Sequence, residues 1–226
     1  MREYKDCYVA FLDMLGFKKM IEKKTCAEIL DIYGMINRPV NKLIVNGSEI
    51  PNIDNVQLKV MSDSICFYID SNIENALPFL VLQCLVFQMR LASLPEPIFV
   101  RGAITKGNLY AEGDVTFGPA ITQAYLMEEN NAKYPRIIML GETIEQGKSN
   151  CGNDMHKVFE KYVFQDEDEF FTIDIFKVFI GADKDGTQTV QLMEYVEKVL
   201  SSTYDSSIRE KYLYVAKNLR KNLINQ

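Results

Sequence analysis

The sequence is poor in the residues and motifs that mark several common classes of protein. It has no tryptophan and one histidine, His156, which excludes a histidine-rich metal site and makes a Ser-His-Asp triad a poor explanation. Its five cysteines are odd in number and contain no Cys-x-x-Cys pair, so neither a disulfide framework nor a zinc ribbon is indicated. Gly-x-Gly-x-x-Gly and a complete Walker motif are missing, which removes the Rossmann and P-loop interpretations.

Positive charge and long hydrophobic runs are also scarce. Lysine and arginine number 25 against 31 aspartates and glutamates, and without a basic stripe the chain is not expected to bind nucleic acid. The longest apolar stretch, 76–94, is broken by a proline, two glutamines and an arginine, so we expect a buried helix and no membrane partner. The first hydrophobic run is interrupted by aspartates and does not resemble a signal peptide. These features predict a cytoplasmic protein.

What the chain does contain is an alternation of strand and helix patterns that predicts an α+β fold. We expect strands at 7–12, 56–61, 65–70, 98–110, 136–140 and 170–176. Helices are expected from Phe17, over 29–43, 74–94 and 141–148, and from Pro119 to about 130. Beyond Gly186 the pattern indicates two amphipathic helices. We therefore predict a domain over 1–180, with helices against a mainly antiparallel sheet, and a helical tail over 187–226.

Two of these strands each deliver one carboxylate to a turn. Asp13 ends the first strand just before Gly16, and Asp63 lies at the tip of the 56–70 hairpin. Paired carboxylates suit two hard cations, Mg²⁺ or Mn²⁺, which bridge a triphosphate and lower the pKa of an attacking hydroxyl. The alternative is that Asp13 caps a helix and Asp63 decorates a turn. The pair therefore predicts a two-cation nucleotide site.

Two basic residues accompany the carboxylates. Arg101 lies in the predicted 98–110 strand before Gly102, whose lack of a side chain would let a phosphate or another backbone approach. Lys59 lies four positions before Asp63, so in an extended strand it points to the same face and is able to contact a base. The alternatives are a structural ion pair for Arg101 and simple solvation for Lys59.

These segments resemble the class III nucleotidyl cyclases over about residues 8–140. Phe11–Phe17 is similar to the family's Phe-x-Asp-x-x-Gly-Phe metal motif, and Lys59–Asp63 to its second-metal hairpin. The segment from Val100 to Gly107 is similar to the family's Arg-x-Gly-Ile-x-x-Gly strand. Phe117–Glu128 falls where the family has Tyr-Gly-x-x-Val-Asn-x-Ala-x-Arg-Leu-Glu. The resemblance implies the ferredoxin-like or palm sandwich of that family.

The resemblance also implies roles for individual residues. The cations, two Mn²⁺ or Mg²⁺, would be held by Asp13, Asp63 and the carbonyl of Met14. The nucleotide would be bound by the amides of Leu15, Gly16 and Phe17, by Lys59 at the base, by Thr122, and by Arg101 as a catalytic contact to phosphate. The family works as a head-to-tail homodimer, so a second copy is the implied partner.

The chain departs from the family at three positions. The transition-state Asn and Arg positions fall on Thr122 and Leu126, and the base-reading Asp position falls on Val115, next to Asp114. The resemblance thus implies a cyclase that converts a nucleoside triphosphate, with UTP or CTP favoured, to a 3′,5′-cyclic mononucleotide in antiphage defence. The alternative is a weak or inactive cyclase-like regulatory or scaffold domain. A palm-type polymerase ranks last, because its Gly-Gly-Asp-type hairpin is missing.

Overall fold

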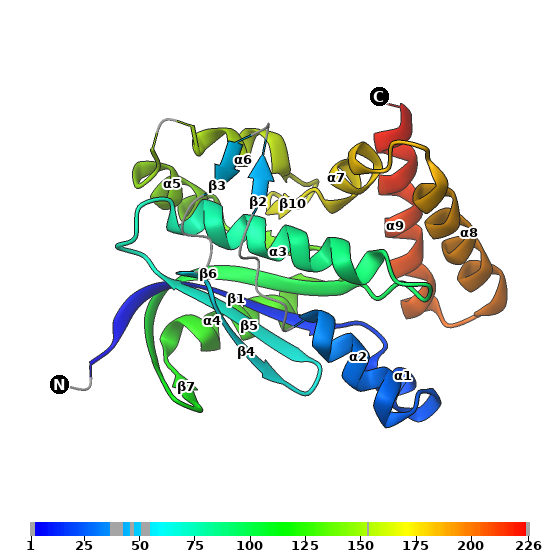
Figure 1. Cartoon of the computed structure of the whole chain (residues 1–226), viewed down its shortest axis with the longest axis horizontal. Helices are drawn as coiled ribbons and strands as arrows, with labels where there is room; N and C mark the ends of the chain where they lie inside the picture. The colour runs from blue at the N-terminus through cyan, green and yellow to red at the C-terminus, as the bar shows by residue number, and fades with distance from the viewer. Residues whose placement is uncertain (1–2, 37–42, 46–47, 51–54, 153, 225–226) are drawn as a thin grey trace.

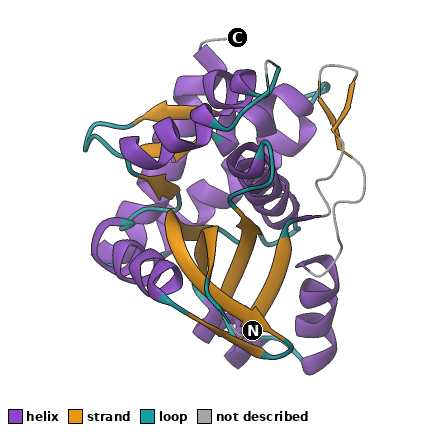
Figure 2. Ribbon diagram, turned by 90° about the vertical axis from the view of Figure 1, so that its left-hand side faces the viewer, coloured by secondary structure: helices purple, strands orange, loops and turns teal. Residues whose placement is uncertain are grey.

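The molecule is a mixed sheet with helices on both faces, shown as a computed structural model in Figures 1 and 2. The structure describes residues 3–36, 43–45, 48–50, 55–152 and 154–224. None of the described helices is long and apolar enough to cross a membrane.

Four strands form the centre of the sheet, in the spatial order β4-β5-β1-β6. They are β1 (Lys5–Met14), β4 (Gln57–Met61), β5 (Ser64–Asp70) and β6 (Val100–Glu112). All neighbouring pairs among them are antiparallel. Helices α1 (Phe17–Lys23) and α2 (Cys26–Ile36) lie between β1 and β4 in the chain, and α3 (Ala76–Ala92) between β5 and β6. This order is ferredoxin-like, and the predicted α+β fold is confirmed.

Shorter strands extend this centre. They are β7 (Val115–Phe117) in a hairpin with β6, β8 (Ile137–Met139) parallel to β6, β10 (Phe171–Ile173), and β9 (Val163–Gln165) at the edge. Strands β2 (Leu43–Val45) and β3 (Ser48–Ile50) form a separate pair.

The side chains of β1 alternate between two hydrophobic clusters, as the period of a strand requires. Tyr8, Leu12 and Met14 belong to the main core, which includes nearly all of α3. Val9 packs with Ala120 of α4 (Pro119–Asn131) in a smaller cluster on the opposite face. Asp13 follows the same alternation as Val9, so its carboxylate lies on the α4 face.

The C-terminal part of the chain is helical. It contains α5 (Gly141–Ser149), α6 (His156–Tyr162), α7 (Ile175–Ala182), α8 (Thr187–Ser202) and α9 (Ser206–Ile224). The predicted two-helix tail is confirmed as α8 and α9, which lie side by side at one end of the sheet (Figure 1). Val196, Val215 and Leu219 are buried in the main core. The boundary predicted between 180 and 187 stays a prediction.

Two predicted elements exist but extend less far along the chain than expected. The helix expected over 29–43 ends at Ile36, residues 37–42 lie outside the described part, and Leu43–Val45 is a strand. The strand expected over 170–176 is limited to Phe171–Ile173, because Asp174 caps α7 by accepting a hydrogen bond from the Lys177 amide.

Candidate active site

The two predicted carboxylates belong to backbone segments that touch. Asp13 pairs with Ser64 of β5 on one side and with Arg101 of β6 on the other. The Met14 amide donates to the Asp63 carbonyl at 3.1 Å, which holds the tip of the β4–β5 hairpin beside the end of β1. Antiparallel pairing therefore brings together residues that lie fifty positions apart in the sequence.

Local geometry removes the alternative that Asp13 caps α1. The N-cap of α1 is Gly16, at φ 79° in the left-handed region that glycine tolerates, and no side chain caps this helix. The hairpin tip is held in place by Tyr33 of α2, whose hydroxyl donates to the Ser62 carbonyl at 2.5 Å. The Asp13 carboxylate therefore has no role in capping α1.

Arg101 lies between two acidic side chains. Its Nε–H donates to Asp13 Oδ2 at 3.2 Å, and Glu128 Oε1 of α4 lies 2.7 Å from the same nitrogen. The single hydrogen on Nε points to Asp13, and Glu128 Oε1 is buried without a hydrogen-bond donor. The structural ion pair considered for Arg101 therefore exists. Both terminal guanidinium nitrogens have no ion-pair partner in the part of the chain that the structure describes, and they are able to bind another anion.

Burial and like charges perturb both acids. Burial raises the pKa of Asp13, and the negative charge of Asp63 raises it further. The hydrogen bond and positive charge of Arg101 lower this pKa, as does the charge of Lys211 on α9. Burial likewise raises the pKa of Glu128 to about 7, with Arg101 opposing and the charge of Asp13 adding. A site with crowded, partly desolvated carboxylates is one that a bound cation would relieve.

Glu128 was not among the predicted site residues, although the sequence holds a signal for it. Ala120, Ala124 and Glu128 recur at a spacing of four, and all three are buried on the inner face of α4. A carboxylate on the buried stripe of a helix needs a partner, and Arg101 is that partner.

Replacing Glu128 with glutamine should make stability less dependent on pH. Between its ordinary pKa of 4.5 and about 7 the unfolded chain releases the Glu128 proton while the native chain keeps it, so wild-type stability falls as pH rises. We expect Glu128→Gln to match wild type near pH 4.5 and to exceed it by about 3 kcal/mol at pH 8. Urea denaturation at both pH values tests this, and an equal difference at both would contradict it.

The oxygen donors present suit hard cations. Asp13, Asp63 and the Met14 carbonyl are the ligand types that Mg²⁺ and Mn²⁺ prefer. Within the described residues no group of three or more His, Cys, Asp and Glu side chains converges on one point. Two carboxylates fit a magnesium-type site, because such ions take their remaining ligands from water and substrate phosphates.

The loop after β1 supplies fewer free amides than the sequence suggested. The Leu15 amide donates to the Phe99 carbonyl at 2.9 Å, so the predicted contact from Leu15 to a triphosphate would break an existing hydrogen bond. For the amides of Gly16 and Phe17, no partner exists among the residues that the structure describes. Two of the three predicted donors are thus open.

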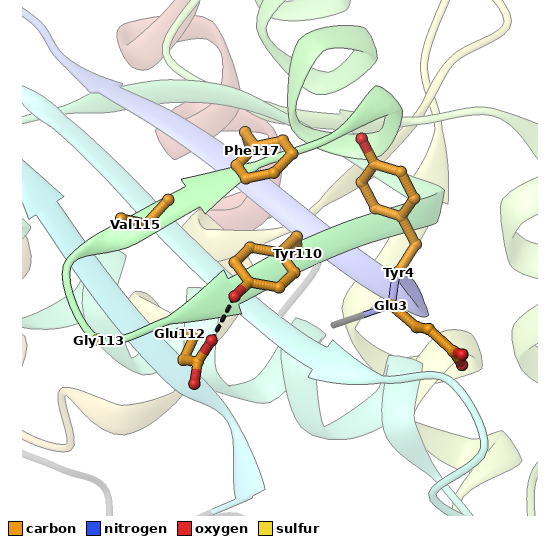
Figure 3. A pocket seen from close by; sticks show the side chains of 7 residues that line it. All are labelled: Glu3, Tyr4, Tyr110, Glu112, Gly113, Val115 and Phe117. Atoms are coloured by element: carbon orange, nitrogen blue, oxygen red, sulfur yellow. Dashed lines mark hydrogen bonds between the residues drawn. The ribbon is translucent and has the colours of Figure 1, made fainter. Parts of the chain in front are cut away.

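Lys59 lies on the Asp13 face of the sheet, and its amine is already bound to a backbone carbonyl. Register pairs Lys59 with Cys66 and Cys66 with Phe11, so these side chains share the face of Asp13. The Lys59 amine donates to the carbonyl of Gly113, in the β6–β7 turn. Gly113 borders an aromatic cavity of about 570 Å³ with Tyr110 among its walls, and neither Asp13 nor Asp63 is among the residues that line it (Figure 3).

Among the described residues, Thr122 has no recognised hydrogen bond to Asp13 or Asp63. It lies on the exposed side of α4, and its hydroxyl donates to the Gly118 carbonyl at 3.2 Å. Tyr125 and Leu126 are also exposed on this helix, at 43% and 48%. The proposed contact of Thr122 with a nucleotide stays a prediction.

Comparison with known proteins finds likeness of structure but not of sequence. No protein-family model matches the chain, and no curated protein does. The guanylyl cyclase domain of the RhoGC fusion protein from the fungus Blastocladiella emersonii is 12% identical, with TM-score 0.49, over 76% of this chain and 95% of that one. The adenylyl cyclase CyaB from P. aeruginosa is 13% identical, with TM-score 0.46, over 76% and 94%. An adenylate/guanylate cyclase/hydrolase from Silicibacter pomeroyi is 20% identical, with TM-score 0.44, over 65% and 82%.

Proposed function

We propose that this chain is a metal-dependent nucleotide cyclase that converts a nucleoside triphosphate to a 3′,5′-cyclic mononucleotide and pyrophosphate. The observation that carries the proposal is the 3.1 Å hydrogen bond from Met14 to Asp63, which places two carboxylate-bearing turns together beside a loop with open amides. In the reaction the ribose 3′-oxygen forms a bond to the α-phosphorus. The bond between the α-phosphorus and the oxygen that bridges to the β-phosphorus breaks, so pyrophosphate leaves, and the hydroxyl proton is released.

The side chains divide the work in this proposal. Asp13, Asp63 and the Met14 carbonyl would hold two Mn²⁺ or Mg²⁺ ions, which supply charge stabilisation and acidify the attacking hydroxyl. Arg101, fixed by Asp13 and Glu128, presents its terminal nitrogens to a phosphate oxygen.

The proposed enzyme uses a pyrimidine nucleotide, works as a homodimer and acts in antiphage defence. Val115, 55% exposed, stands where the resemblance places a base-reading carboxylate, which favours UTP or CTP over a purine nucleotide. The exposed Thr122, Tyr125 and Leu126 on α4 suit a head-to-tail homodimer, in which a second copy would cover them. Second-messenger synthesis in antiphage defence, in the cytoplasm, is the setting that the resemblance favours.

A second candidate function is nucleotide binding without turnover, as a regulatory or scaffold domain. It is favoured by Leu126, which presents no charge at the position where the resemblance places a transition-state arginine. The loss of such a group commonly costs orders of magnitude in rate.

Turnover separates the two functions. The purified chain would be incubated with each of the four nucleoside triphosphates and Mn²⁺, with and without extract of phage-infected cells, and products identified by mass spectrometry. Cyclic UMP or CMP with pyrophosphate supports the full proposal. A purine product alone refutes the pyrimidine preference, and nucleotide binding without any product supports the regulatory function.

A further inference from the structure

The C-terminal helices form one wall of a cavity next to the candidate active site. This cavity, of about 480 Å³, is bordered by Leu15 and Gly16 of the loop after β1, by α1, and by α8 and α9. Residues of the tail therefore line the same space as the loop that follows Asp13 and Met14.

The cavity carries an excess of positive charge in a protein of net charge −6. Four lysines line it, Lys19, Lys23 and Lys24 from α1 and its end, and Lys211 from α9, against one carboxylate, Glu96. Lys24 is paired with Glu96 at 2.6 Å. In the described part of the chain the other three lysines have no ion-pair partner. Three uncompensated ammonium groups around one cavity favour a multiply charged anion.

Lys211 is held beside the loop after β1 by packing. Val215, one turn further along α9, is fully buried in the main core. The ring of the adjacent Tyr212 contacts Phe99 edge-on, with centroids 5.8 Å apart, and the Phe99 carbonyl accepts the hydrogen bond from Leu15. Phe99 thus contacts both helix α9 and the loop after β1. The charge of Lys211 reaches Asp13, where it favours the ionised carboxylate.

We infer that Lys211, with Lys19 and Lys23, makes this cavity a polyphosphate site that the tail completes within one chain. Because it builds on the proposed cyclase function, the site is assigned to the β- and γ-phosphates of the substrate and to the pyrophosphate that leaves. Lysine suits this role because its ammonium is a compact point charge on a flexible stem. The tail is then part of the phosphate site, with Lys211 as a binding residue.

Binding of inorganic pyrophosphate and tripolyphosphate tests this inference without turnover. Isothermal titration of the full chain with each anion and Mg²⁺ should show binding that Lys211→Gln weakens about tenfold, the loss expected for one charge-assisted contact. Lys211→Arg should retain most of the affinity. Lys217→Gln is the matched control, because Lys217 lies on the same helix with its side chain 63% exposed and paired with Glu167.

The outcomes distinguish this inference from the proposed function. If tripolyphosphate binding depends on Lys211 but the chain turns over no nucleotide, the polyphosphate site is supported and the cyclase function is refuted. If the chain turns over nucleotide but wild type and Lys211→Gln bind pyrophosphate equally well, the assignment of the cavity as a polyphosphate site is overturned. Equal weakening by Lys211→Gln and Lys217→Gln also overturns it, since the effect would then be one of net charge. Thermal denaturation of each variant shows that the fold is retained.

Discussion

Asp13→Asn should reduce cyclic nucleotide formation by about 1,000-fold or more, the scale of loss when one preorganised charge is removed from such a site. Asparagine keeps the shape of the side chain but loses the negative charge that a cation requires. Asp13 also accepts the Nε–H of Arg101, and an asparagine oxygen can still do so, which should keep the β1–β6 pairing intact. The measurement is initial rate with Mn²⁺ by mass spectrometry.

The matched control is Asp31→Asn, an exposed carboxylate of α2, which should retain wild-type activity. Thermal unfolding should show that Asp13→Asn is folded, so that lost activity reports the site. Turnover that survives in folded Asp13→Asn would show that the assignment of this residue to the cations is wrong.

Gly102→Ala should destabilise the protein by about 3 kcal/mol, the upper part of the range for overpacking a well-packed interior. A Cβ at this position would lie 2.5 Å from the carbonyl oxygen of Phe11 and would also meet a methyl group of Leu12. The Phe11 carbonyl belongs to β1 and cannot retreat without disturbing the pairing of Asp13 with Arg101. Urea denaturation measures the effect.

Gly34→Ala provides the control for this prediction. Gly34 lies within α2, and a Cβ there meets no other atom within 4 Å. Alanine favours a helix over glycine, so this variant should be more stable by about 0.5–1 kcal/mol. Equal effects of the two substitutions would contradict the close approach of β1 and β6.

The same glycine shows what the sequence was able to predict. Small residues after Arg101 indicated that either a phosphate or a backbone comes close, and residue type alone does not separate these. The sheet register decides the question, because Gly102 lies opposite Leu12 and against Phe11. The period of two and the turn signals predicted the strands and the 56–70 hairpin, but not that β1 lies between β5 and β6.

Lys211 shows the limit of sequence patterns for the site. Its helix was predicted from the spacing of apolar residues, which identifies a buried stripe without identifying what that stripe packs against. The contact of Tyr212 with Phe99 joins positions more than a hundred residues apart. Burial of Glu128 was easier to predict from the sequence, because Glu128 and the buried Ala124 lie four residues apart on the same helix.

The proposed cyclase function requires Asp13 and Asp63 to bind divalent cations together with a nucleoside triphosphate. Electron paramagnetic resonance of free Mn²⁺, titrated with protein and a 3′-deoxy nucleoside triphosphate that cannot cyclise, measures this binding without any activator. We expect both Asp13→Asn and Asp63→Asn to weaken Mn²⁺ binding at least about tenfold relative to wild type and to Asp31→Asn. Equal Mn²⁺ affinity in wild type and both variants would show that these two carboxylates do not hold the cations.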